Sequence, residues 1–189
     1  MKSQSNTRLI IIGGSAGSLQ VIIEMIKNLD DTIHIPILLV IHRKAQSGDI
    51  LRTLLQQFTK VKVVEIEDKT EIEENTIFIV PADYHVLFEN NKNMSLDSSE
   101  KMNYSRPSID VTFRSAAEVY GENLIGVLLS GANADGVEGL SYIKKNNGKV
   151  WIQDPETAEV DYMPKHAIDE INYDLIITPG TLANYIKQL

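Results

Sequence analysis

The stretch Arg8–Gly17, RLIIIGGSAG, decides how the rest of the chain is interpreted. Leu9 to Ile12 is a short, wholly apolar run, which predicts a buried strand. It leads directly into Gly13–Gly17, which fits the pattern G-x-S-x-G of a sharp strand-to-helix turn that exposes a serine hydroxyl. Only small neighbours let a substrate and the next helix approach such a serine. The stretch therefore predicts Ser15 as a nucleophile at the edge of a sheet.

This glycine-rich turn has two other interpretations. It could be a phosphate- or nucleotide-binding turn, or simply a tight connection between a strand and a helix. The dinucleotide fingerprint G-x-G-x-x-G does not occur here, and no Gly-Lys-Ser/Thr closes the loop as in a P-loop. The choice depends on whether a general base and an orienting acid reach the same place.

Length and composition narrow the class of protein. With 189 residues, 43% of them hydrophobic, we expect a single domain over residues 1–189. The formal net charge of -8 argues against nucleic acid or an anionic membrane as the main partner. The absence of cysteine excludes thiol catalysis, and four scattered histidines give no metal-site pattern. The polar N-terminus and the lack of a membrane-length apolar run favour a cytoplasmic location.

Strand-like and helix-like segments alternate along the chain, which predicts an α/β fold. We expect a three-layer, doubly wound, mostly parallel sheet with an antiparallel hairpin over 85–96 that has an Asn-rich turn. The strand-like runs 61–66 and 76–80 are predicted to form a pair without a crossover, because the spacer between them is short and polar. In such a fold the ligand crevice lies outside the carboxyl ends of the strands.

Three chemically complementary residues follow the carboxyl ends of different predicted strands: Ser15, His42 and Asp135. They are the set required for acyl transfer through a hydroxyl, with histidine as general base and aspartate fixing its tautomer. The backbone amides of Ala16 and Ala132 are the candidate oxyanion donors. Alternatively, His42 is a structural histidine at a strand end, and Asp135 only caps the helix that follows it.

Other polar residues lie near these strand ends. His85 follows Asp83 in a strand-end loop and is a candidate for lining the site. Arg106, Ser108 and Asp110 open a predicted helix; they could border the crevice, but capping and structural pairing are the preferred explanation.

At this point the sequence resembles a known family, the catalytic domain of the CheB-type protein-glutamate methylesterases of chemotaxis. The resemblance covers nearly the whole chain. It is carried by IIGGSAGS at 11–18, VIHR at 40–43, IFIVPADYHV at 77–86, RPSIDVTFRSAA at 106–117, GVLLSGANADGVEGL at 126–140 and QDPETAEVDYMPKHAI at 153–168.

The resemblance implies a serine hydrolase that needs no cofactor and no metal. It places the family's catalytic triad on Ser15, His42 and Asp135, and its backbone oxyanion donors on Ala16 and Ala132. It implies hydrolysis of glutamyl methyl esters of chemoreceptors through an acyl-enzyme, and in some members deamidation of receptor glutamines. The implied partner is a methylated chemoreceptor or a related signalling protein.

The sequence departs from the family pattern at the site. Ser18 replaces a glycine, and GANADG stands where GMGxDG is usual, so that Ala132 and Asn133 alter the wall of the pocket. Asn133 is therefore a second candidate for lining the site. We expect no receiver domain in this chain, so that a separate regulator would take its place. The alternative function is a CheB-like binding or scaffolding module without methylesterase activity.

Overall fold

The structure is a computed structural model that describes residues 8–44, 49–90 and 92–189. Within these residues a seven-stranded sheet has the order β10-β9-β8-β1-β2-β5-β3, with every neighbouring pair parallel. Its strands are β1 (Leu9–Gly14), β2 (Ile37–Ile41), β3 (Lys62–Glu65), β5 (Thr76–Ile79), β8 (Leu124–Leu128), β9 (Lys149–Gln153) and β10 (Leu175–Ile177). The strand that leads to Ser15 therefore lies in the middle of the sheet.

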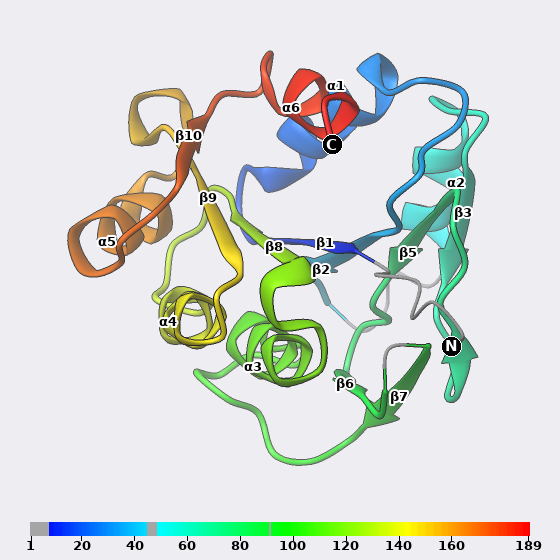
Figure 1. The fold of residues 1–189 in the computed structure, drawn as a ribbon, viewed down its shortest axis with the longest axis horizontal. Coiled ribbons are helices and arrows are strands. Elements are labelled where there is room, and N and C mark those ends of the chain that lie inside the picture. The colour runs from blue at the N-terminus through cyan, green and yellow to red at the C-terminus, as the bar shows by residue number, and fades with distance from the viewer. Residues whose placement is uncertain (1–7, 45–48, 91) are drawn as a thin grey trace, which may run out of the picture.

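Helices cover both faces of this sheet (Figure 1). Packed on one face are α1 (Ser18–Asn28), α2 (Ile50–Gln56) and α6 (Leu182–Lys187). Packed on the other are α3 (Ile109–Tyr120), α4 (Val137–Lys145) and α5 (Tyr162–Glu170). Among the described residues, no helix combines the length and the apolar character that crossing a bilayer would require.

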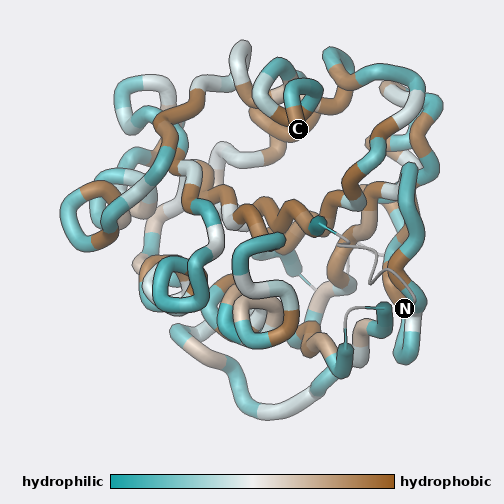
Figure 2. The backbone as a smooth tube through the Cα atoms, in the orientation of Figure 1, coloured by the Kyte–Doolittle hydropathy of each residue, from teal (hydrophilic) through white to brown (hydrophobic). Residues whose placement is uncertain are grey.

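Two hydrophobic cores result from the alternation of side chains along the strands. On β1, Ile10 and Ile12 pack into the core beneath α1, whereas Leu9 and Ile11 pack into the core beneath α3 and α4. Because both faces are covered, the strand residues are almost all apolar, and Figure 2 shows them as the hydrophobic centre of a hydrophilic shell.

A second, smaller sheet is antiparallel and has the order β4-β7-β6. Its strands are β4 (Thr70–Glu71), β6 (His85–Phe88) and β7 (Asn93–Asp97). It is joined to α3, where Ser115 Oγ accepts a hydrogen bond of 2.8 Å from the amide of Phe88. The predicted hairpin and the predicted fold class are confirmed; Asn91, in the predicted turn, lies outside the described residues.

The expectation for runs 61–66 and 76–80 was right about the pairing but wrong about the lack of a crossover. β3 and β5 are neighbours, but they run parallel, with Val63 opposite Ile77. The short spacer contains β4, which pairs with β7 in the other sheet. Because the connection leaves the main sheet to form this strand, it returns to start β5 in the same direction as β3.

Candidate active site

Ser15 lies in the loop between the central strand β1 and α1, and neighbouring loops hold this loop on both sides. Its amide donates a hydrogen bond of 2.9 Å to Ser130 O, and the amide of His42 donates one of 3.1 Å to Gly14 O. Gly17 then starts α1 with a φ of 80°, a conformation that L side chains rarely adopt. The backbone on either side of the serine is therefore fixed by its neighbours.

The loop after β8 approaches the serine closely at Gly131. A Cβ atom placed on Gly131 would lie 3.1 Å from Ser15 Cβ and 2.5 Å from Met163 Cε. Met163 is fully buried and belongs to α5. A glycine is thus required at position 131 for the two loops to approach each other, and Met163 packs against this glycine.

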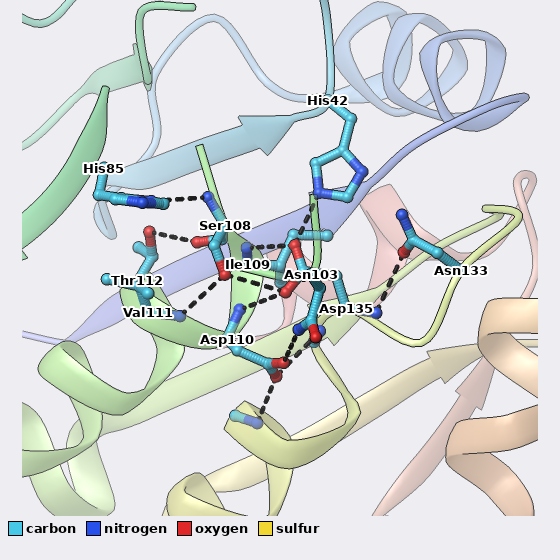
Figure 3. Close-up of polar contacts among 12 residues, drawn as sticks. His42, His85, Asn103, Ser108, Ile109, Asp110, Val111, Thr112, Asn133 and Asp135 are labelled. Atoms are coloured by element: carbon cyan, nitrogen blue, oxygen red, sulfur yellow. Dashed lines mark hydrogen bonds and ion pairs between the residues drawn. The ribbon is translucent and has the colours of Figure 1, made fainter. Parts of the chain in front are cut away.

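His42 and Asp135 form a direct pair (Figure 3). His42 follows β2 and Asp135 follows β8, so both come from strands that flank β1. The distance between His42 Nε2 and Asp135 Oδ2 is 2.7 Å. The Asp135 side chain is fully buried, and 12% of the His42 side chain is exposed. The carboxylate is shielded from water, while the imidazole still reaches the surface.

Asp135 is bound by the N-terminus of α3 and does not cap its own helix. Its Oδ1 accepts hydrogen bonds from Ser108 Oγ (3.0 Å) and the Asp110 amide (2.9 Å), and its Oδ2 accepts one of 2.7 Å from the Ile109 amide. The N-cap residue of α4 is Gly136. The helix N-terminus favours a negative charge at this position.

These contacts decide the ionisation of Asp135. Burial alone would raise its pKa, but the hydrogen bonds from the His42 ring and from the amides of Asp110 and Ile109 outweigh it and hold the pKa below the ordinary value. An ionised carboxylate accepts hydrogen bonds only, so His42 Nε2 must carry the proton. Nδ1 of the ring is then the nitrogen left to act as a base.

No hydrogen bond joins the Ser15 hydroxyl to the His42 ring in the described part of the chain. The backbone contact between His42 and Gly14 nevertheless keeps the two residues adjacent. Such contacts are often long in the absence of substrate and tighten when it binds.

The two candidate oxyanion donors are available. The amides of Ala16 and Ala132 bind no acceptor within the described residues, and both residues are exposed. By contrast, the Gly131 amide is already bound to Val160 O at 3.1 Å. Ser130 Oγ donates to Ala16 O at 2.7 Å, which ties the loop after β8 to the turn that contains the serine.

Of the two candidates for lining the site, Asn133 contacts Asp135 directly, and His85 contacts Ser108, which donates a hydrogen bond to Asp135. Ser108 N donates to His85 Nδ1 at 3.0 Å, and His85 Nε2 donates to Glu100 O at 2.9 Å, so the buried ring holds the residue that caps α3. Asn133 Oδ1 accepts a hydrogen bond of 3.0 Å from the Asp135 amide. Both act on the position of the carboxylate.

The Asp110 carboxylate binds the N-terminus of α4, just as the Asp135 carboxylate binds the N-terminus of α3. Its Oδ1 accepts hydrogen bonds from the amides of Gly136 (2.9 Å) and Gly139 (2.6 Å), and Asn103 Nδ2 donates to its Oδ2 at 3.0 Å. Burial raises the pKa of Asp110 to about 7; the charge of Asp135 adds to this effect, and the two backbone amides oppose it. Asp135, which precedes α4, therefore binds the start of α3, and Asp110, in the first turn of α3, binds the start of α4.

The raised pKa of Asp110 predicts a pH-dependent stability. Between the ordinary value of 3.8 and about 7, the folded chain keeps a proton that the unfolded chain releases. The free energy of unfolding should therefore be highest at the acidic end of this window and fall toward pH 7, by up to about 1.4 kcal/mol per pH unit from this group. Urea unfolding from pH 5 to 8 measures it. The Asp110→Asn variant should lack this slope, and parallel curves for both proteins would contradict the prediction.

Sequence reasoning gave less weight to several residues that support the site. It treated Ser108 and Asp110 mainly as capping residues, and it did not single out Ser130 or Met163. The RPSID and SGANADG segments were the available signal. They contain Asp110 and Asp135, and each of these carboxylates binds backbone amides at the start of a helix. Among the described residues, no group of three or more His, Cys, Asp or Glu is arranged to hold a metal ion.

The chain is similar to known proteins of one family. The family model described as CheB methylesterase matches residues 10–186. A solved structure, the Thermotoga maritima CheB methylesterase catalytic domain, superposes with a TM-score of 0.91 at 31% identity, covering 96% of this chain and 98% of that one.

Two curated relatives differ in length. The protein-glutamate methylesterase/protein-glutamine glutaminase of Thermotoga maritima is 33% identical over 173 residues, which are 90% of this chain and 50% of that protein. A Leptospira interrogans protein, provisionally given the same name, is 39% identical over 184 residues. These residues are 97% of this chain and 95% of that protein. From the model match, the relatives and the shared fold, the chain belongs to the CheB methylesterase family.

Proposed function

We propose that this chain is a serine hydrolase that removes methyl groups from glutamyl methyl esters of a chemoreceptor. The observation that carries the proposal is the 2.7 Å pair of His42 and a buried, ionised Asp135 beside the loop that contains Ser15. The names of the relatives, protein-glutamate methylesterase/protein-glutamine glutaminase, support the choice of substrate.

In the first half-reaction Ser15 Oγ attacks the ester carbonyl carbon while His42 Nδ1 takes the hydroxyl proton. The carbonyl oxygen becomes an oxyanion, which the amides of Ala16 and Ala132 stabilise; one such donor contributes roughly 2.7–4 kcal/mol. Asp135 stabilises the positive charge on the ring. When the tetrahedral intermediate collapses, the methoxy group leaves with the proton from His42 as methanol, and the glutamyl acyl group stays on Ser15.

In the second half-reaction water attacks the acyl-enzyme. His42 takes a proton from the water and returns it to Ser15 Oγ as the ester bond to the enzyme breaks, which releases the glutamate side chain. A glutamine side chain would form the same acyl-enzyme with ammonia as the leaving group. The same residues therefore account for both activities that the relatives' names combine.

The proposal is tested by measuring methanol release from a methylated receptor fragment, with an unmethylated fragment as the baseline. We expect methanol above the baseline, and loss of activity in proportion to labelling by a fluorophosphonate. The label should form an Oγ–P bond on Ser15 with loss of fluoride, located by mass spectrometry of the peptide. Binding of the fragment without methanol release would instead support a scaffolding module.

A further inference from the structure

A basic cavity of about 480 Å³ opens beside His42. Among the described residues that line it, four are basic and one is acidic: Arg43, Lys44, Lys101, Arg106 and Asp83. Asp83 is bound by Arg106, with 2.7 Å between Oδ1 and Nη2. The whole chain, by contrast, has 26 acidic and 18 basic residues. Arg43 Nη2 is paired with Glu65 Oε2 at 2.6 Å. The described lining of this cavity beside His42 therefore has more basic than acidic side chains, whereas the chain as a whole is acidic.

One side of this cavity is formed by residues 101–106, which we call the rim hairpin. The backbones of Met102 and Ser105 exchange two hydrogen bonds, of 2.9 and 3.1 Å, and close it. Arg106 anchors its base by donating to the carbonyls of Ser98 and Ser99, each at 2.8 Å. Asn103 joins it to α3 through its 3.0 Å bond to Asp110. The rim hairpin is therefore held in place from three directions.

The rim hairpin presents two side chains that no structural role accounts for. Tyr104 is 99% exposed and has a φ of 62°, which is unusual for a bulky residue. Lys101 is exposed, and its ammonium group is not bound to any acid in the part of the chain that the structure describes. Both line the cavity beside His42 and also a second hollow on the rim hairpin.

We propose that the rim hairpin is the docking element for the substrate protein, and that it binds an acidic segment flanking the esterified glutamate. Lys101 pairs with a carboxylate of that segment, and Tyr104 packs against its apolar side chains. The basic residues around the cavity favour such a partner by charge complementarity. The exposed tyrosine supplies the apolar area that interfaces concentrate in a few residues. This inference rests on the proposed function for the reaction that follows docking.

The test uses two synthetic peptides that carry one γ-methyl glutamate and one leucine, flanked either by glutamates or by glutamines. The third substrate is N-acetyl-glutamate γ-methyl ester amide, which is too small to reach the rim hairpin. We expect the wild-type protein to prefer the glutamate-flanked peptide, with KM several-fold lower and rising with salt. Lys101→Ala should abolish this preference, and Lys101→Glu should reverse it.

Tyr104→Ala should raise KM for both peptides by roughly five- to thirty-fold while kcat for the small ester stays unchanged. The matched controls are Lys187→Ala on α6 and Tyr173→Ala, because neither residue lines this cavity. A wild-type protein without preference for flanking glutamates, or variants that lose activity equally on the small ester, would overturn the proposal.

Failure of the proposed function would look different from failure of docking. If the wild-type protein released methanol from no substrate, the hydrolase assignment would fail. Docking would then be measured by fluorescence anisotropy of the labelled peptides. Weaker binding of the glutamate-flanked peptide to Lys101→Ala and Tyr104→Ala would still support the rim hairpin, and unchanged binding would overturn it.

Discussion

Replacing Ser15 with alanine is expected to lower the rate of methanol release by about 10⁶-fold, to the level left by binding and oxyanion stabilisation alone. The reason is that the proposed covalent step has no substitute: the chain contains no cysteine, and Ser15 follows Gly14, whose carbonyl accepts a hydrogen bond from the His42 amide. The measurement is kcat on a methylated receptor fragment.

The variant should keep its fold. The Ser15 contacts in the structure are made by its backbone, to Ser130 O and from Ser18, and alanine retains them. The melting temperature should therefore stay close to that of the wild type. Ser141→Ala on α4, where the hydroxyl donates a hydrogen bond to Glu138 O, is the matched control and should keep full activity. Substantial residual activity in Ser15→Ala would move the nucleophile elsewhere.

The sequence predicts that Ser15, His42 and Asp135 lie at one edge of the sheet, and it does so for a physical reason. Each follows a strand that belongs to one parallel sheet, and parallel strands end at the same edge. That inference needed only the order and type of the elements. It did not need side-chain positions, which is why it could be made without coordinates. The hydroxyl-to-imidazole contact itself stays a prediction.

What the sequence left open depends on packing between helices. Asp135 stands next to the start of α4, so local reasoning suggested a cap there; in the structure α3 packs against α4, and the start of α3 takes the carboxylate instead. The parallel pairing of β3 and β5 was missed for a similar reason, because β4 finds its partner in a distant hairpin. The rim hairpin, too, owes its position to packing, through the contact of Arg106 with Asp83, 23 residues away, and that of Asn103 with Asp110 on α3.

Replacing Asp135 with asparagine is expected to lower kcat by roughly 10⁴-fold. His42 Nε2 would then face an amide that offers an NH₂ group or a neutral oxygen. The ring would lose the partner that fixes its proton on Nε2 and stabilises its positive charge.

The same substitution should also destabilise the fold. Both oxygens of Asp135 accept hydrogen bonds from backbone amides, Oδ1 from Asp110 and Oδ2 from Ile109. Either orientation of an asparagine amide would turn its NH₂ group toward one of these donors. A buried donor left without an acceptor costs about 1–3 kcal/mol. Ser108→Ala is the control, because it removes a donor to the same carboxylate and leaves its charge and its contact with His42 in place.

These two effects separate catalysis from capping. If Asp135 only holds the start of α3, the asparagine variant should unfold more easily, while its folded fraction keeps the wild-type kcat. If Asp135 also orients His42, kcat must fall at temperatures and urea concentrations where circular dichroism shows the variant fully folded. Ser108→Ala should then lose stability with little change in kcat, because the charge that acts on the imidazole is still present.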